Sequence, residues 1–263
     1  MATPQTATVW QGRVPLRVHV QGSGPAVVFL HGPWGLAWGA FLDALAKRFT
    51  VYAPEHPGTT PGEPDAVQHV DNVWDLVLCY DELLDHLRLD EVMLVGHSFG
   101  AMMACEVAAL RPARVRRLAL IDPIGLWRDD APVINWMLLS PQELPGQVFE
   151  APDGAEAKAL FSIPEEPEDA ALARTRLAWA MGSTGKFMWP IPDKGLKKRI
   201  HRIAAPTLLI WGEGDRLVPR VYADEFARRL RQARIELVKG AGHAPHIEQP
   251  ETTARLVEAF LGG

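Results

Sequence analysis

Two hydrophobic patterns alternate along the chain. Continuous apolar runs such as Ala26–Leu30 are typical of strands that are buried on both faces of a sheet. Between about residues 71 and 87, apolar side chains that include Val73, Trp74 and Val77 fall on one stripe at helical spacing. This spacing predicts an amphipathic helix with the stripe buried. Glycines and a proline in residues 21–25 predict a hairpin-like turn.

Followed from end to end, the two patterns predict strands that alternate with helices. The strands cover residues 14–20, 26–30, 50–53, 91–95, 115–121, 206–211 and 234–238, and the helices cover residues 41–48, 71–87, 99–110, 221–230 and 251–261. Such alternation forms right-handed βαβ crossovers. The sequence therefore predicts a mostly parallel sheet with helices on both faces, in which ligands bind beyond the carboxyl ends of the strands.

The alternation stops between residues 123 and 205. This segment is rich in proline, tryptophan and methionine and holds only short helical patches. Because a structureless loop of this length is rare in a compact domain, we expect an inserted cap over the carboxyl ends of the strands. The core domain would comprise residues 1–122 and 206–263, and the cap residues 123–205. The lysines and arginines of residues 194–202 are expected on the solvated face of a helix.

Composition and charge narrow the class of protein. Of 263 residues, 48% are hydrophobic and 22% charged, a balance that excludes a mostly disordered chain. The net charge of −5 gives no electrostatic support for nucleic-acid binding. Residues 1–14 lack the pattern of a signal peptide, and the longest apolar stretch, residues 26–46, is too interrupted for a membrane span. Cys79 and Cys105 are expected to be buried thiols in a cytoplasmic protein.

The strongest chemical signal is the pentapeptide Gly96-His-Ser98-Phe-Gly100, which follows one predicted strand and opens a helix. A serine at the apex of such a strand–turn–helix is held in a strained backbone with its Oγ exposed. Small residues at positions 96 and 100 would let the strand and the helix approach closely. The amino terminus of the helix also directs free N–H groups at a developing oxyanion. The alternative is an ordinary serine cap in a glycine-rich turn.

Three further segments extend this signal, and with them the sequence resembles members of the α/β-hydrolase superfamily. His31–Gly35 resembles the oxyanion loop, Gly212–Pro219 the acid loop and Gly240–His243 the histidine loop. The resemblance implies an α/β fold with a mostly parallel central sheet flanked by helices and a helical cap inserted after the sixth strand. It also implies a cofactor-independent serine hydrolase, with no cofactor and no metal ion.

In this resemblance Ser98, Asp215 and His243 stand in the order that the fold uses for its triad. A serine hydroxyl is a poor nucleophile at neutral pH and needs an adjacent base. The imidazole of His243 can take and return a proton, because its type titrates near pH ~6.5. Asp215 would fix the tautomer of this ring and stabilise the imidazolium.

Other residues compete for these roles. His246 lies three positions after His243 and is the weaker candidate for the base. Glu213 shares the acid loop and is expected in solvent. Asp122, at the end of the preceding strand, is an alternative acid. His97 is expected to pack beneath the turn rather than to face the base.

The expected oxyanion hole departs from the family pattern. The backbone N–H of Phe99 should supply one donor. The second donor usually follows His-Gly in the first loop, but Pro33 stands there and has no N–H. Either Trp34 supplies the second donor, or the loop is shifted, or the hole lacks a donor; of these we assign the donor to Trp34. The neighbouring loop also departs from the family pattern, because Glu55 and Thr60 stand where relatives more often carry Asp and Gly. No catalytic role is assigned to Glu55 or His56, and a surface loop is expected.

The most favoured activity is the hydrolysis of a small to medium carboxylic ester through an acyl-enzyme. Hydrolysis of a carbon–carbon bond in a diketone-like ring-cleavage product is an alternative, which would favour an arginine in the cleft from Arg128, Arg174 or Arg176. A non-catalytic ligand receptor on the same fold is a third hypothesis. The partner is expected to be a small ester-like molecule, with no nucleic acid or membrane, and the oligomeric state is open.

Aromatic and methionine residues gather in the inserted segment. They either line an acyl or alcohol pocket or form a small core of the cap itself. The residues are Trp127, Trp136, Met137, Trp179, Met181, Phe187, Met188 and Trp189.

Overall fold

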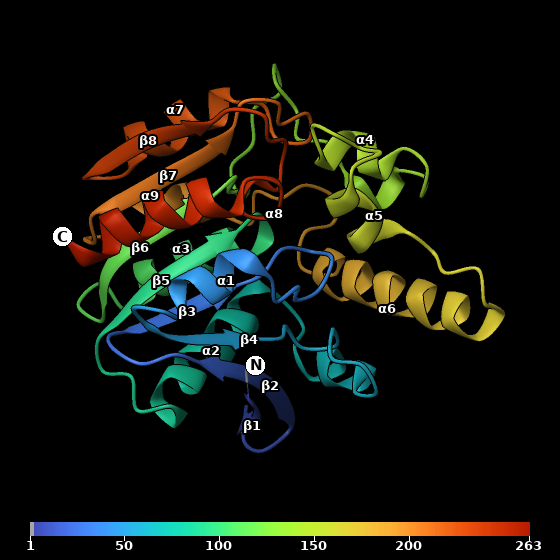
Figure 1. Cartoon of the computed structure of the whole chain (residues 1–263). Coiled ribbons are helices and arrows are strands. Elements are labelled where there is room, and N and C mark those ends of the chain that lie inside the picture. Colours follow the sequence, from blue (N-terminus) through green and yellow to red (C-terminus); the bar gives the residue numbers. More distant parts are fainter. Residues whose placement is uncertain (1–2) are drawn as a thin grey trace.

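The computed structural model describes residues 3–263, and in this part of the chain eight strands form one sheet (Figure 1). The strands are β1 (Thr3–Val9), β2 (Val14–Gln21), β3 (Ala26–Leu30), β4 (Thr50–Pro54), β5 (Val92–His97), β6 (Val115–Ile121), β7 (Thr207–Gly212) and β8 (Ala233–Val238). Their order in the sheet is β1-β2-β4-β3-β5-β6-β7-β8. The pairs from β4 to β8 are parallel, which confirms the predicted mostly parallel sheet.

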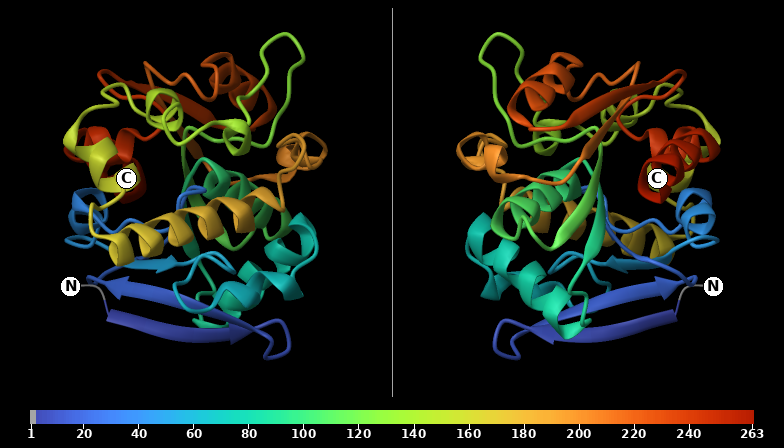
Figure 2. Two further views of the ribbon diagram at one scale, coloured as in Figure 1. Left: turned by 90° about the vertical axis from the view of Figure 1, so that its right-hand side faces the viewer. Right: turned by 90° about the vertical axis from the view of Figure 1, so that its left-hand side faces the viewer.

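The sequence does not predict β1, which pairs antiparallel with β2 and forms one edge of the sheet (Figure 2). Strand β1 buries only one of its faces, through alternate side chains such as Ala7 and Val9. Its sequence therefore shows no continuous apolar run. One such short alternation next to the start of the chain is a weak signal.

The hairpin expected at residues 21–25 is wrong. Strand β2 pairs antiparallel with β4, and β3 pairs parallel with the opposite side of β4. The glycines instead allow residues 22–24 to lie directly against the backbone of residues 46–49. A Cβ on Gly22 or Gly24 would overlap backbone carbonyl oxygens of residues 46–49, and both glycines have the positive φ that a side chain disfavours, 91° and 117°.

Helices cover both faces of the sheet, as the alternation predicts. On one face lie α2 (Val73–His86), α3 (Phe99–Leu110) and α7 (Val221–Arg229), and on the other lie α1 (Ala40–Leu45) and α9 (Pro250–Gly262). Strand β3 shows how the layers are built, because alternate side chains of a strand point to opposite faces. Val28 belongs to the core under α2 and α3, whereas Phe29 belongs to the core under α1 and α9.

Residues 123–205 leave the sheet after β6 and return to it at β7. They contain α4 (Leu144–Val148), α5 (Ala155–Phe161), α6 (Pro167–Gly185) and the short 3-10 turns η2 (Trp136–Leu138), η3 (Leu196–Lys198) and η4 (Ile200–Arg202). Figure 1 places α4, α5 and α6 beyond the carboxyl ends of the parallel strands. The division of the chain into a core and a separate cap domain stays a prediction.

The aromatic and methionine residues of this segment divide into three groups by burial. Trp136, Phe187 and Met188 are buried, Trp127 and Met181 are partly buried, and Met137, Trp179 and Trp189 are exposed. The buried group can contribute to the surroundings of a site at the sheet.

The basic stretch at residues 194–202 differs from its expected form. It forms the two turns η3 and η4 rather than one helix. Arg199 is half-buried rather than on a solvated face: its Nε and Nη2 each lie 2.7 Å from a carboxylate oxygen of Glu106, which is fully buried in α3. The guanidinium also lies 5.6 Å from the ring centroid of Trp74. Trp74, expected in the buried stripe of α2, is 43% exposed and provides this platform instead.

Two further expectations concern the described residues as a whole. In residues 3–263 no helix has both the length and the apolar character that a membrane crossing requires.

Cys79 and Cys105 are buried free thiols, as predicted. Burial is the main cause that raises the pKa of Cys79 to about 12, so this thiol stays protonated at neutral pH.

The ion pair of Arg199 with Glu106 holds residues 123–205 to α3, and its contribution to stability can be tested. Arg199→Ala leaves a carboxylate buried without its partner, and such a loss costs about 3–5 kcal/mol. Because the Arg199 side chain is 29% exposed, we expect a loss at the low end of this range. Urea unfolding should show a free energy of unfolding that is lower by about 3 kcal/mol. Lys198→Ala on the exposed surface should change the free energy of unfolding by less than about 0.5 kcal/mol. Equal effects of the two variants would contradict this account.

Candidate active site

Ser98 lies at a tight turn between β5 and α3, with φ 52° and ψ −113°. A positive φ is uncommon for a residue with a Cβ and persists only where the surroundings enforce it. Two glycines make room for this turn. A Cβ on Gly96 would lie 2.6 Å from backbone atoms of α3, and a Cβ on Gly100 would overlap the carbonyl oxygens of Leu30 and His31. Helix α3 therefore approaches β3 and β5 as closely as the motif predicts.

His243 bridges Ser98 and Asp215. Its Nε2 is 2.7 Å from Ser98 Oγ, and its Nδ1 is 2.8 Å from Asp215 Oδ2. Because an ionised carboxylate only accepts hydrogen bonds, Nδ1–H donates to Asp215 and Nε2 accepts from the Ser98 hydroxyl. The side chains of His243 and Asp215 are 0% and 1% exposed, and Ser98 is 0% exposed, so water does not compete for these bonds.

The acid loop itself fixes the carboxylate of Asp215. Its Oδ1 accepts hydrogen bonds from the backbone N–H groups of Leu217 and Val218, both at 2.9 Å. Gly212 at the end of β7 touches the histidine loop, since a Cβ there would overlap the carbonyl oxygen of Gly242. The two loops are thus packed backbone against backbone, which sets the separation of Asp215 from His243.

The two rival residues on these loops do not reach Ser98. His246 packs its ring against His97 with the centroids 4.3 Å apart. Burial, and then the charge of His243, lowers the pKa of His246 to about 3, so the ring is neutral. Glu213 is exposed to solvent, as expected.

His97 has a contact that sequence reasoning missed. It packs beneath the turn as expected, but its Nε2 also lies 2.7 Å from the backbone carbonyl oxygen of His243. A carbonyl oxygen only accepts, so Nε2–H is the donor. The ring also fills the space beside Gly32, where a Cβ would lie 2.5 Å from its Nδ1. One neutral imidazole therefore holds the oxyanion loop and the histidine loop in register. Its place directly before Ser98 was the only sequence signal.

The interpretation of Glu55 and His56 as part of a surface loop is wrong, because both side chains are buried. His56 Nε2 donates to the carbonyl oxygen of His31 at 2.7 Å, and His56 Nδ1 contacts the hydroxyl of Tyr80. The backbone N–H of His56 donates to His31 Nε2 at 3.0 Å. Burial lowers the pKa of His56 to about 4, which keeps this imidazole neutral. His56 thus supports the oxyanion loop from beneath, and Glu55 pairs with His19 at 2.9 Å.

Both expected oxyanion donors lie next to aromatic residues of the 123–205 segment. Phe99 is the first residue of α3, so its N–H has no partner within the helix. Its ring stacks on Phe187 with the centroids 6.3 Å apart. Trp34 meets Trp136 and Phe161 edge to face, at 5.7 and 5.5 Å between ring centroids. The ring of Trp34 therefore forms a wall between the oxyanion loop and that segment.

Asp122, the alternative acid, lies beside Asp215, and it is Asp215 that is hydrogen-bonded to His243. It follows β6 with φ 43°, and its Oδ1 accepts a hydrogen bond from the N–H of Gly212 at 3.0 Å. Its Oδ2 is buried and receives no hydrogen bond from the residues that the structure describes. Burial, followed by the charge of Asp215, raises the pKa of Asp122 well above its usual range.

Within residues 3–263, one group of side chains has the spacing of metal ligands. One ligand atom from each of Asp122, Asp215 and His243 lies within 4.8 Å of the others. The group does not fit a metal ion well, because His243 uses Nδ1 for Asp215 and Nε2 for Ser98. Neither ring nitrogen is left with a free lone pair directed at a cation.

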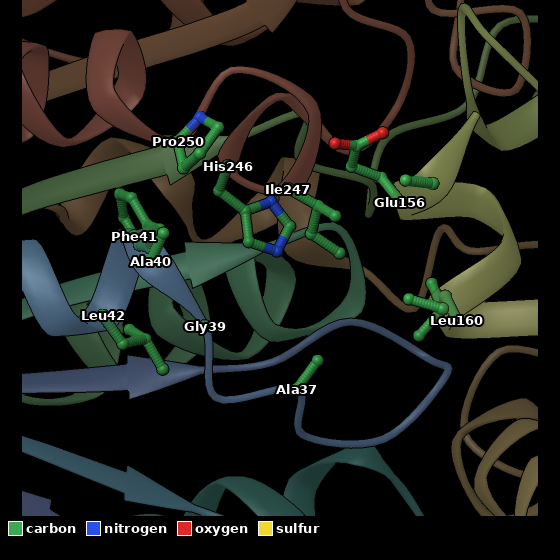
Figure 3. A pocket seen from close by; sticks show the side chains of 12 residues that line it. Ala37, Gly39, Ala40, Phe41, Leu42, Glu156, Leu160, His246, Ile247 and Pro250 are labelled. Atoms are coloured by element: carbon green, nitrogen blue, oxygen red, sulfur yellow. The ribbon is translucent and has the colours of Figure 1, made fainter. Parts of the chain in front are cut away.

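An apolar cavity of about 360 Å³ lies beside the site, between the start of α1, helix α5 and α8 (Pro245–Glu248) (Figure 3). His246 and Ile247 form part of its wall, and Leu160 of α5 closes it from the other side. Ser98 is not among the lining residues. The cavity therefore adjoins the site without opening onto the serine in this conformation.

Comparison with known proteins places this geometry in context. A pimeloyl-[acyl-carrier protein] methyl ester esterase of Aromatoleum aromaticum is 29% identical over 260 residues, which cover 91% of this chain and 99% of the esterase. The structure of a bacterial membrane phospholipase A superposes with a TM-score of 0.78 at 24% identity and covers 100% of this chain and 86% of its own. A meta-cleavage product hydrolase from Pseudomonas fluorescens IP01 superposes with a TM-score of 0.75 at 23% identity, over 95% and 94% of the two chains.

The two superpositions show a shared fold, since both identities are below 25%. The sequence itself matches the profile of one family over residues 27–256. This match spans most of the chain, from β3 into α9, and includes the loops that carry Ser98, Asp215 and His243. The chain therefore belongs to the alpha/beta hydrolase family.

Proposed function

We propose that this protein is a cofactor-independent serine hydrolase that cleaves small to medium carboxylic esters through an acyl-enzyme. The observation that carries the proposal is the unbroken chain of hydrogen bonds from Ser98 Oγ through His243 to Asp215. A nucleophile within hydrogen-bond reach of a base, which a third group orients, is the arrangement that this chemistry needs. The methyl ester esterase relative supports the reaction class.

Each group then has one task in the reaction. Ser98 Oγ attacks the ester carbonyl carbon while His243 Nε2 takes the hydroxyl proton. Asp215 stabilises the imidazolium that forms and holds the ring in the required tautomer. The imidazolium next protonates the leaving alkoxide, and Ser98 remains acylated. In the second half, His243 removes a proton from water, the hydroxide attacks the acyl carbon, and Ser98 recovers its proton.

The oxyanion would be held by the backbone N–H groups of Phe99 and Trp34. Phe99 contributes the first N–H of a twelve-residue helix, where the partial positive charge of the helix favours an anion. Pro33 removes the N–H that relatives use, so Trp34 is the next residue of the loop that can donate. His31 and His56 fix this loop by three buried contacts.

Ester hydrolysis is favoured over carbon–carbon bond hydrolysis because no arginine named for an anionic substrate is directed at Ser98. Arg128 bonds to Asp130 and Glu225. Arg174 and Arg176 are exposed on α6. The resemblance to the meta-cleavage product hydrolase extends to the fold alone.

Substrate access requires movement of the residues that cover the site. Ser98 and His243 are both 0% exposed, and Trp136, Phe161 and Phe187 of residues 123–205 contact the two oxyanion residues. We infer that this segment acts as a cap that opens for substrate. Its apolar inner surface favours a small, apolar ester over a nucleic acid or a membrane. A cytoplasmic location remains an expectation of the sequence.

The first prediction concerns the three hydrogen-bonded residues. With p-nitrophenyl acetate, Ser98→Ala or His243→Ala should each lower kcat by about four to six decades, and the double variant should be little worse, because the groups act as a unit. Asp215→Asn should lower kcat by a factor on the order of 10⁴. Retention of most activity by Ser98→Ala would exclude the mechanism. A receptor on this fold would show no turnover in the natural protein either.

The second prediction concerns the nucleophile and the absence of a metal requirement. An organophosphonate should add once, on Ser98, and abolish activity, because Ser98 is the one serine in residues 3–263 whose hydroxyl is hydrogen-bonded to an imidazole. A chelator such as EDTA should leave the rate unchanged, since both nitrogens of His243 are engaged. Mass mapping of the adduct to another residue, or inhibition by the chelator, speaks against the proposal.

The third prediction concerns the oxyanion hole. In a crystal structure of the phosphonate adduct, the phosphoryl oxygen should accept hydrogen bonds from the N–H groups of Trp34 and Phe99, each at about 2.7–3.1 Å. Pro33 fixes its own φ near −65°, which allows the following N–H to turn towards Ser98. If the Trp34 N–H faces away from Ser98 in the adduct, the second donor is another group.

A further inference from the structure

We propose that Asp122 keeps its proton in the folded protein and donates it to Asp215, and that it thereby acts as a positioning residue behind Ser98 and His243. The proposal deepens the proposed function and rests on it for its meaning. Its first test, however, needs no substrate, so the two can fail separately.

The position of Asp122 is fixed by backbone contacts on both of its sides. Its own N–H donates to the carbonyl oxygen of Ile210 at 2.9 Å, and its Oδ1 accepts from the N–H of Gly212 at 3.0 Å. These bonds tie the end of β6 to the last residues of β7, from which the acid loop departs. The remaining oxygen, Oδ2, is buried and has no N–H donor among residues 3–263. An oxygen of Asp215 lies within 4.8 Å of an oxygen of Asp122.

The titratable groups that face Asp122 come from three segments. Asp215 faces it from the acid loop, His243 from the histidine loop and Glu248 from α8. Within residues 3–263 no lysine or arginine forms an ion pair with it. Two buried carboxylates this close, with no cation between them, are not both ionised, because the cost of burying the second charge exceeds the cost of protonating it.

Hydrogen bonds decide which of the two carboxyl groups keeps the proton. Asp215 accepts three, from Leu217, Val218 and His243, and donors of this kind stabilise the ionised form. Asp122 accepts one, from Gly212. Asp215 is therefore the ionised member and Asp122 the neutral one. The proton lies on Oδ2 of Asp122, the oxygen without an N–H donor, and this O–H donates to the Asp215 carboxylate.

A neutral Asp122 matters for the reaction in two ways. It gives Asp215 a further donor, so the carboxylate keeps its orientation towards His243 when the imidazolium forms. It also keeps a second negative charge away from His243. Two carboxylates beside this ring would stabilise the imidazolium before the reaction starts, and a protonated ring could not accept the proton of Ser98.

Asp122→Asn distinguishes a protonated from an ionised Asp122 through folding alone. Asparagine is neutral in both states, whereas Asp122 ionises on unfolding above pH ~4. If the folded protein holds this proton, stability falls with rising pH relative to the variant. The unfolding constant of the natural protein, divided by that of Asp122→Asn, should then rise about tenfold per pH unit between about pH 5 and 7. The variant therefore gains relative stability as the pH rises.

Urea unfolding of both proteins across this pH range measures the ratio. Glu213→Gln is the matched control: Glu213 is exposed and forms no ion pair within residues 3–263, so the ratio for this variant should stay constant. A ratio for Asp122→Asn that is also constant above about pH 5 would overturn the proposal.

Kinetics test the positioning role. In Asp122→Asn, kcat should fall about two- to fivefold because an amide is the weaker donor, while the acid limb of kcat/KM stays within about 0.3 pH unit. Asp122→Ala, which removes both hydrogen bonds, should lower kcat about 10- to 100-fold with KM unchanged. An acid limb displaced by about one unit to lower pH in Asp122→Asn would mean that a negative charge had been removed, which contradicts the proposal. NMR titration of the His243 ring gives the same comparison without turnover.

Discussion

The close approach of α3 to strands β3 and β5 is the constraint on which the rest of the site depends. Gly96 and Gly100 leave no room for a side chain at this crossing, so the backbone of Ser98 is forced to φ 52°. That turn aims Oγ away from the sheet and leaves the first N–H of the helix free beside it. A larger residue at either glycine would separate helix and strand and would displace both the Ser98 hydroxyl and the N–H of Phe99, the proposed nucleophile and oxyanion donor.

Neutral histidines build the scaffold around this turn. Burial lowers the pKa of His31, His56, His97 and His246, so none of these rings carries a charge at neutral pH. A neutral imidazole offers one donor and one acceptor, and His31, His56 and His97 each bond at least one backbone group of the surrounding loops. Of the histidines in residues 3–263, His243 is the one that is hydrogen-bonded to the Ser98 hydroxyl. Histidine therefore bridges loops where its ring bonds backbone groups. It is the proposed base where a carboxylate and a hydroxyl flank its ring.

Residues 123–205, the proposed cap, contact the core at two places. Its aromatic residues Trp136 and Phe187 contact Trp34 and Phe99, while Arg199 reaches Glu106 in the body of α3. The helix that carries the nucleophile turn is thus bonded to the covering segment at a second point along its length.

The sequence by itself determined the alternation of strands and helices, the turn at Ser98 and the order of Ser98, Asp215 and His243 along the chain. These are local properties, since helical periodicity and the spacing of two glycines are fixed by neighbouring residues. The tertiary structure alone decided the antiparallel pairing of β1, the support of the oxyanion loop by His56 and the placement of Asp122 beside Asp215. His97 shows why: its acceptor on His243 is 146 positions away in the chain. No local pattern encodes a contact between segments that only the closed sheet brings together.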